Sequence, residues 1–275
     1  MIDLHLHTTA SDGFSTPDAL VARAQSVGLT TIAVTDHDTL AAVPIAREAA
    51  RHLGLRVIPG IEITAVQRGQ DVHILGYFVE PGDGELDQFL DAQRADRRRR
   101  LAEILDRLVD LGAPVAESDL GVDPDAPAAR SVGRPLVARA LVEAGHARDI
   151  NDAFDRFLGH GRPAFVPRRG AAPGEVIGMI NRVGGLTSFA HPGKLGLDAL
   201  IGELAGLGLA AIEAFHPDHA AKDVEKYRRL AAELGLALTG GSDFHGPGAG
   251  RVDALGEVVL PVAEFAAFEA RRSRP

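Results

Sequence analysis

The sequence predicts an α/β protein in which a parallel sheet, open or closed into a barrel, is interrupted by a helical insertion. Short apolar runs alternate with amphipathic stretches of helical period in the first 82 residues and again after residue 170. Between them, residues 83–165 show helical patterns and no clear strand. We therefore expect residues 1–82 and 166–275 to form the barrel and residues 83–165 to form a subdomain over it.

The N-terminal part begins with a strand and a helix that has clear start and stop signals. Ile2–His7 alternates apolar and polar residues, as a strand does. Thr16 is suited to cap the helix and Pro17 to occupy its first position, and Gly28 ends it. The same criteria predict strand Thr30–Thr35, helix Thr39–Leu53, strand Leu55–Thr64 with a break at Pro59-Gly60, and strand Asp71–Val79.

The middle segment is predicted to contain three helices, of which Leu86–Leu111 is the longest. Its apolar residues keep helical spacing, and a loop rich in Asp, Pro and Gly follows over Pro114–Pro127. The other two helices are Arg134–Glu143 and Asp149–Leu158. The run Arg97–Arg100 spreads around the long helix among acidic neighbours, so we expect a solvated surface there and no nucleic-acid patch.

After residue 170 the alternation of helices and strands returns. The predicted elements are helix Pro173–Arg182, strand Leu186–Ala190, helix Leu197–Gly206, strand Ala210–Phe215, helix Asp218–Leu234, strand Leu236–Thr239, strand Leu255–Leu260 and helix Ala263–Arg272.

Composition limits the partners and the metal chemistry. Hydrophobic residues make up 45% of the 275 residues, which is enough for a large core, and the formal net charge is −9. Long duplex nucleic acid is therefore an unexpected partner, whereas a small anionic substrate stays compatible with bound metal ions. With no cysteine, a metal would be held by His and carboxylates, a set that suits Zn, Mn or Fe. No secretory or membrane-spanning pattern appears, so we expect a cytoplasmic protein without membrane contact.

Histidines and carboxylates recur where the predicted strands end. In His5-Leu6-His7 both imidazoles point to one side of a strand and can share a metal ion. Glu62 stands in an apolar strand, where a carboxylate is costly to bury unless it is paired or metal-bound. The other candidate ligands are Asp12, His37, His73, His191, Asp243 and His245. A barrel would bring these strand ends together on one face, with ligands enough for two or three metals.

Each position also has an ordinary explanation. Asp12 lies in a Ser-Asp-Gly turn, a common place for an aspartate. Asp36 and Asp38 could orient the His37 ring, and Asp38 could equally cap the next helix. The joint pattern favours the metal site over these separate explanations.

The order of these motifs resembles the PHP (polymerase and histidinol phosphatase) superfamily. The matching positions are His5-x-His7, Asp12, Thr35-Asp36-His37, Gly60-x-Glu62, His73, His191-Pro192 and Asp243-x-His245, which run from residue 1 to about residue 246. Within it, Gly133-Arg134-Pro135, Gly185–Pro192 and Phe215-His216-Pro217-Asp218-His219 are similar to nucleoside 3',5'-bisphosphate phosphatases, whose relatives trim short RNAs from the 5' end. One departure is Leu136, where many members have His.

The resemblance implies a distorted (β/α)7 TIM-like barrel, the PHP fold, with two to three divalent metal ions. By analogy, one metal would be held by His5, His7, Glu62 and Asp243, a second by Glu62, His73 and His191, and a third by Asp12, His37 and His245. The implied reaction is hydrolysis of a phosphomonoester of a small nucleotide, most of all the 3'-phosphate of a nucleoside 3',5'-bisphosphate, with short RNA as a further substrate. A metal-bound hydroxide would attack the phosphorus, with Asp12 and His191 nearby.

Four residues are candidates for contact with the substrate. Arg134 follows Gly133 near the start of a predicted helix and is the best candidate for a phosphate contact. His216 and His219 follow a strand end, and Lys194 comes shortly after His191. Each could also be an ordinary surface or helix-capping residue. His52, His146 and His160 are expected to be surface or packing residues.

Three other functions compete with this hypothesis. A histidinol-phosphate phosphatase would share the metals and differ in the pocket above them. An amidohydrolase barrel also opens with His-x-His, but often needs a carboxylated Lys in mid-barrel that no strand here offers. A non-catalytic metal-binding module would resemble the PHP regions of replicative polymerases, although the complete ligand set argues against it.

Overall fold

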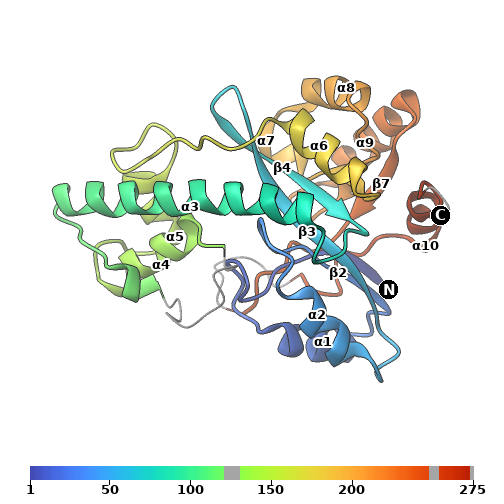
Figure 1. Ribbon diagram of the computed structural model, residues 1–275, viewed down its shortest axis with the longest axis horizontal. Coiled ribbons are helices and arrows are strands. Elements are labelled where there is room, and N and C mark those ends of the chain that lie inside the picture. The colour runs from blue at the N-terminus through green and yellow to red at the C-terminus, as the bar shows by residue number, and fades with distance from the viewer. Residues whose placement is uncertain (121–130, 248–253, 273–275) are drawn as a thin grey trace.

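Seven strands form one curved sheet in chain order in the computed structural model, which describes residues 1–120, 131–247 and 254–272 (Figure 1). The strands are β1 Ile2–Leu6, β2 Thr31–Val34, β3 Arg56–Gln67, β4 Gln70–Tyr77, β5 Leu186–Phe189, β6 Ala211–Phe215 and β7 Ala237–Gly240. The sheet nearly closes, because Leu6 and Phe244 form a parallel bridge and the His7 amide donates to the Phe244 carbonyl at 2.9 Å. The predicted fold class, a distorted seven-stranded barrel with a helical insertion, is confirmed.

The fourth strand runs against its neighbours, so the expectation of an all-parallel sheet is wrong. β4 pairs antiparallel with both β3 and β5. Only Arg68 and Gly69 connect β3 to β4, both with positive φ (51° and 79°), which is a tight hairpin and leaves no room for a crossover helix. The reversal brings His73, near the start of β4, opposite Thr64, near the end of β3. His73 therefore lies at the same end of the barrel as the carboxyl ends of the parallel strands.

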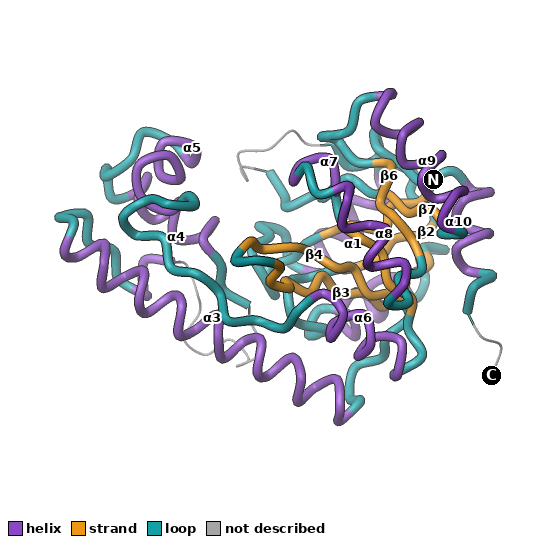
Figure 2. The backbone as a smooth tube through the Cα atoms, turned by 90° about the horizontal axis from the view of Figure 1, so that it is seen from above, coloured by secondary structure: helices purple, strands orange, loops and turns teal. Residues whose placement is uncertain are grey.

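Helices cover the outside of the sheet (Figures 1 and 2). They are α1 Pro17–Ser26, α2 Val43–Ala50, α6 Pro173–Arg182, α7 Pro192–Leu195, α8 Asp198–Gly206, α9 Ala221–Leu234 and α10 Val262–Glu269. The Thr16 side chain caps α1, accepting from the Ala19 amide. No helix of the described residues is long and apolar enough to cross a membrane.

Several predicted elements differ from the structure. The strand expected over residues 255–260 does not form, since this segment turns at Gly256 with φ of 81°. The break expected at Pro59-Gly60 is absent, and β3 runs through it. Gly60 instead permits close packing, because a Cβ there would lie 2.8 Å from Thr35 Cγ2. The short helix α7 was not predicted, and α2 is shorter than expected.

The helical segment builds a second apolar core beside the barrel. It contains α3 Gly84–Asp110, a 3₁₀ turn at Glu117–Leu120, α4 Arg134–Glu143, α5 Ile150–Ala153 and a π-helical turn at Phe154–Leu158. Both views show α4 and α5 against one end of α3, away from the strands (Figures 1 and 2). Leu101, Ile104 and Leu108 of α3 pack there with Val137 and Leu141 of α4. The other end of α3 joins the barrel core through Leu86 and Leu90.

The expectation of a solvated surface at Arg97–Arg100 is wrong for two of the four side chains. Arg97 and Arg100 are only 6% and 5% exposed, whereas Arg98 is exposed. Arg97 follows Leu90 by seven residues and Arg100 precedes Ile104 by four, so both lie on the buried apolar stripe of α3. They face the barrel end that carries the candidate ligands.

A glycine that directly follows β7 allows close packing against β1. A Cβ on Gly241 would meet the His5 backbone nitrogen and lie 2.7 Å from the His5 Cβ. We expect Gly241→Ala to reduce the free energy of unfolding by about 1–3 kcal/mol, measured in urea, because β1 must move to admit the methyl group. Gly202→Ala in α8 is the control: nothing lies within 4 Å there, so it should raise stability by about 0.5–1 kcal/mol. Equal effects of the two substitutions would contradict this packing argument.

Candidate metal centre

The nine side chains proposed from the sequence as metal ligands lie together at one end of the barrel. They come from the strands or from the segments that directly follow them. All are buried except His73, whose side chain is 25% exposed. The structure therefore brings together residues from position 5 to position 245 of the chain.

Glu62 lies at the centre of this cluster, with five imidazoles around its carboxylate. Around Oε1 lie His73 Nδ1 at 2.7 Å and His191 Nε2 at 3.2 Å. Around Oε2 lie His7 Nε2 and His37 Nδ1, both at 3.2 Å, and His5 Nε2 at 3.4 Å. One carboxylate that faces five ring nitrogens through both oxygens has the geometry of a bridging ligand.

Two aspartates complete the cluster on either side of Glu62. Asp243 Oδ1 lies 3.4 Å from His5 Nε2 and 3.3 Å from His7 Nε2. Asp12 Oδ2 lies 3.7 Å from His37 Nε2, and Asp12 Oδ1 lies 3.5 Å from His245 Nε2. Three groups have ligand atoms within 4.8 Å of one another: His5, His7 and Asp243; His7, Asp12, His37 and His245; and His37, Glu62 and His73.

Several ring nitrogens of the cluster lack a hydrogen-bond partner, although His5 Nε2 and His7 Nε2 lie 3.1 Å apart, within hydrogen-bond distance of one another. Nδ1 of His7, His37, His73 and His191 is buried without a hydrogen-bond partner, although carboxylate oxygens lie near three of them. Unsatisfied buried nitrogens are costly unless another group accepts their lone pairs. A set of His and carboxylate donors with this arrangement fits divalent metal ions.

The orientation of the His5 ring is set by Glu213, a residue that was not predicted from the sequence. Glu213 is fully buried in β6, and its Oε1 accepts from His5 Nδ1 at 2.8 Å while Oε2 accepts from the His191 amide at 2.7 Å. Because Nδ1 donates to Glu213, Nε2 is the nitrogen of His5 that faces the cluster and would bind a metal ion there. A signal was available, because Glu213 is a carboxylate inside the apolar run Ala-Ile-Glu-Ala-Phe, the same argument that identified Glu62.

Burial and neighbouring charges shift the pKa values of these groups in opposite directions. Burial disfavours ionisation of Glu62, but the nearby imidazoles of His73, His37 and His5 outweigh it and hold the pKa of Glu62 well below its usual range. Burial lowers the pKa of His191 to about 4, so its imidazole is neutral near pH 7. Burial also opposes a charge on His5, but Glu213, Glu62 and Asp243 hold the pKa of His5 well above its ordinary value.

The backbone is strained at two positions of the cluster and at one position beside it. Asp38, His191 and Asp243 have φ of 52°, 31° and 49°. Positive φ is uncommon for residues with a Cβ, and such strain is typical of functional sites held in place by the surrounding fold. At His191 and Asp243, which follow the ends of β5 and β7, the positive φ accompanies side chains that lie beside Glu62 and His7.

The aspartates beside His37 hold the surrounding loops and not the His37 ring. Asp36 accepts hydrogen bonds from the Thr8 amide at 2.8 Å and from the Ser11 hydroxyl at 2.5 Å, which fixes the loop that carries Asp12. Asp38 Oδ1 accepts from the Thr64 amide at 3.0 Å, and Oδ2 accepts from Arg97 Nε at 2.5 Å.

The four candidate substrate contacts lie in different surroundings. Arg134 reaches a cavity beside the cluster, where its Nη2 donates to Asp71 Oδ2 at 3.1 Å. His216 Nε2 lies 3.4 Å from Asp243 Oδ2. His219 contacts backbone through both nitrogens, donating to the Ala214 carbonyl at 2.9 Å and accepting from the Gly193 amide at 3.2 Å.

Lys194 lies in α7, and its side chain is outside the described part of the structure. Leu136 is buried in α4 and does not line the cavity. The expected loop at residues 114–127 falls partly outside the described residues, since residues 121–130 are not described.

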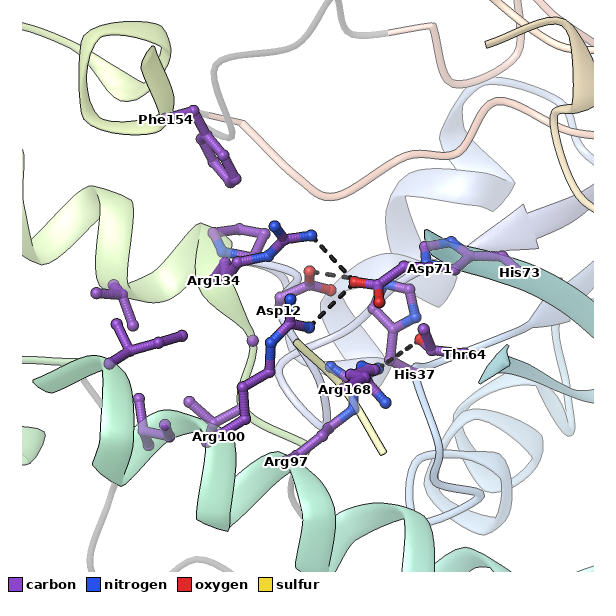
Figure 3. A pocket seen from close by; sticks show the side chains of 16 residues that line it. Asp12, His37, Thr64, Asp71, His73, Arg97, Arg100, Arg134, Phe154 and Arg168 are labelled. Atoms are coloured by element: carbon purple, nitrogen blue, oxygen red, sulfur yellow. Dashed lines mark hydrogen bonds and ion pairs between the residues drawn. The ribbon is translucent and has the colours of Figure 1, made fainter. Parts of the chain in front are cut away.

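A cavity of about 300 Å³ opens beside Asp12, His37 and His73. Arginines from three parts of the chain converge on it, as the close view shows (Figure 3). They are Arg97 and Arg100 of α3, Arg134 of α4, and Arg168. The apolar part of the lining is formed by Leu101, Ile104, Val132, Pro135, Val137 and Phe154.

Comparison with known proteins identifies the family. Residues 3–81 match the PHP domain family. The chain is 36% identical over 253 residues to the 5'-3' exoribonuclease Rnm of Salmonella typhimurium, covering 89% of this chain and 85% of that protein. It is 34% identical over 267 residues to the phosphoribosyl 1,2-cyclic phosphate 1,2-diphosphodiesterase of Eggerthella lenta, covering 92% and 97%.

Two further proteins match over almost their whole lengths. The 3',5'-nucleoside bisphosphate phosphatase of Chromobacterium violaceum is 30% identical over 284 aligned positions, covering 100% of this chain and 98% of that protein. A solved structure from Bifidobacterium adolescentis, described as a candidate metal-dependent phosphoesterase, superposes with a TM-score of 0.87 at 31% identity, covering 99% and 96%. From this fold, this cluster and these relatives, we conclude that the chain belongs to the PHP family and is a hydrolase of phosphoester bonds.

Proposed function

We propose that this protein is a metal-dependent phosphatase that removes the 3'-phosphate from nucleoside 3',5'-bisphosphates, and that it also acts on short RNA from the 5' end. The observation that supports this most is the convergence of five imidazoles on the buried Glu62 carboxylate beside an arginine-lined cavity. The names of the relatives from S. typhimurium and C. violaceum point to the same two substrates.

The metal ions would number two or three and be Mn, Zn or Fe. We propose that His5, His7, Glu62 and Asp243 hold one ion, that Glu62, His73 and His191 hold a second, and that Asp12, His37 and His245 hold a third. When bound, such ions lower the pKa of a coordinated water and neutralise charge on the phosphoryl group. The unsatisfied ring nitrogens of His7, His37, His73 and His191 fit this role.

The chain's own residues would position the substrate around these ions. Arg134 would donate hydrogen bonds to a phosphate in the cavity, where a planar guanidinium suits phosphate oxygens. Glu213 holds His5 and the His191 amide in place, and His216 contacts Asp243. Asp12 and His191 would lie near the reacting phosphorus.

The two parts of the chain would have different roles. Residues 1–82 and 166–275 would form the barrel, and residues 83–165 would form a cap subdomain that limits the size of the substrate. The enzyme would be cytoplasmic.

The direct test is phosphate release from adenosine 3',5'-bisphosphate, with added Mn²⁺ and with a chelator. We expect release of one phosphate per nucleotide with AMP as the product, and loss of the activity with chelator. Histidinol phosphate is the comparison substrate, and a clear preference for it would overturn the proposed nucleotide specificity.

Metal binding should also stabilise the fold, because the proposed ligands come from β1, β3, β4 and the segments after β1, β2, β5 and β7. A ligand at 100 times its dissociation constant stabilises the native state by about 2.7 kcal/mol per site. We therefore expect Mn²⁺ or Zn²⁺ to raise the thermal unfolding midpoint and Ca²⁺, which prefers oxygen ligands, to raise it less. Equal shifts with all three ions, or none, would contradict a His-rich centre.

A further inference from the structure

The turn that follows β5 is held by a hydrogen bond at His191 and another two residues later. The His191 amide donates to Glu213 Oε2 at 2.7 Å, and the Gly193 amide donates to His219 Nε2 at 3.2 Å. His191 has φ of 31° and ψ of 53°, a left-handed conformation that is unfavourable for a residue with a Cβ unless its surroundings impose it. The two amide contacts therefore act where the backbone is strained.

The two contacts of the His219 ring require one particular tautomer. Nδ1 lies 2.9 Å from the Ala214 carbonyl oxygen, which can only accept, so Nδ1 carries the proton. Nε2 is then the acceptor that the Gly193 amide requires, because an amide N–H can only donate. Burial lowers the pKa of His219, which favours this neutral ring. With both nitrogens bound to the backbone, the ring has no further N–H or lone pair to offer a substrate.

Close packing fixes the His219 ring in this position. A Cβ on Gly193 would lie 2.8 Å from both Cδ2 and Nε2 of His219, so only a glycine lets the backbone approach the ring this closely. Tyr227 of α9 is fully buried against the ring, with the two ring centroids 5.1 Å apart. The Tyr227 hydroxyl donates to Asp198 Oδ1 at 2.8 Å, which fixes Tyr227 in turn. The His219 ring therefore links the turn after β5 to β6 and α9.

His191 is the side chain whose direction depends on this turn. Its Nε2 lies 3.2 Å from Glu62 Oε1, the oxygen that His73 Nδ1 also approaches. Resting on the proposed function, we propose that His219 is a positioning residue that acts on His191 through the Gly193 amide. It holds the turn so that the His191 ring faces Glu62 and can bind a metal ion there. Residues that orient a metal ligand typically contribute about 10- to 100-fold to metal affinity.

Two substitutions separate the two contacts of the ring. The amide group of Gln reaches the position of Nε2, so His219→Gln retains an acceptor for Gly193 and loses the donor to Ala214. The amide group of Asn reaches the position of Nδ1, so His219→Asn retains the donor and loses the acceptor. His219→Asn should therefore weaken the binding of one Mn²⁺ ion by about 10- to 100-fold in calorimetric titration, and His219→Gln should weaken it less. His52→Asn is the control and should bind Mn²⁺ as the wild type does, because His52 is exposed.

The metal-free protein gives a readout that needs neither metal nor turnover. In hydrogen exchange followed by NMR, the Gly193 amide should exchange about tenfold faster in His219→Asn than in the wild type, the order expected for one lost hydrogen bond. His219→Gln should keep most of the protection. Unchanged Mn²⁺ affinity in His219→Asn, or an equal or larger loss in His219→Gln, would overturn the positioning role and leave the proposed function standing.

Phosphate release separates this role from a direct contact with the substrate. With Mn²⁺ far above its weakened dissociation constant, His219→Asn should release phosphate from adenosine 3',5'-bisphosphate at close to the wild-type rate, because mass action refills the site. Release that stays low at saturating Mn²⁺ would show that His219 acts on the substrate and would overturn the positioning role. If the wild type bound Mn²⁺ but released no phosphate, the proposed substrate would fail, and the Mn²⁺ affinities of the variants would still decide the role of His219. If it bound no Mn²⁺, both proposals would fail.

Discussion

Glu62→Gln is expected to reduce metal-dependent phosphate release by at least about 100-fold, the upper end of the loss seen when only a partner of a metal ligand is removed. The substitution keeps the size of the side chain but replaces one carboxylate oxygen with an amide NH₂. Glu62 presents Oε1 to His73 and His191, and Oε2 to His5, His7 and His37. Because an NH₂ group cannot accept from or bridge these partners, either orientation of the amide disrupts one side of the cluster.

Metal content separates loss of the site from loss of the fold. The purified Glu62→Gln protein should contain fewer metal ions per chain than the wild type by elemental analysis, and its far-ultraviolet circular dichroism should be unchanged. Glu80→Gln is the control, because Glu80 is an exposed carboxylate paired with Arg47 on the surface. Full metal content and full activity in Glu62→Gln would show that the reaction takes place elsewhere on the protein.

Asp38→Asn is expected to lower the free energy of unfolding by about 3–5 kcal/mol, the cost of leaving a buried charge unpaired. Asp38 is fully buried and pairs with Arg97 and Arg168, whose side chains are 6% and 3% exposed. These contacts connect the segment after β2 to α3 and to the chain that returns from the helical segment. Asn is the informative replacement because it tolerates the φ of 52° at this position, so the loss reports the charge and not the backbone.

The measurement is urea unfolding of the metal-free protein near neutral pH. The control is Glu48→Gln, which removes a surface partner of Arg51, where both side chains are more than 60% exposed. Exposed ion pairs contribute only about 0–1 kcal/mol, so the control should stay within that range. A loss below about 1 kcal/mol for Asp38→Asn would mean that Arg97 and Arg168 pair with other groups when residue 38 is neutral.

The local sequence determined which elements form and where the cluster lies along the chain. Helix α4 begins and ends where its pattern predicts, as does α6, since periodicity and terminal signals act over a few residues. The candidate ligands could be identified because polar side chains at strand ends stand out against apolar runs. The same logic, applied to the apolar strand β6, would have included Glu213.

The tertiary structure decided what depends on contacts between distant segments. The direction of β4 follows from a two-residue connection at Arg68-Gly69, whereas the alternation pattern is the same for parallel and antiparallel strands. The arginines of α3 looked like a solvated run, because their partners Asp38 and Asp71 lie 59 and 29 residues away. A buried charge is stable only beside its partner, and pairing across such distances is set by how the elements pack. The sequence therefore determined the ligand cluster, and only packing created the positively charged cavity beside it.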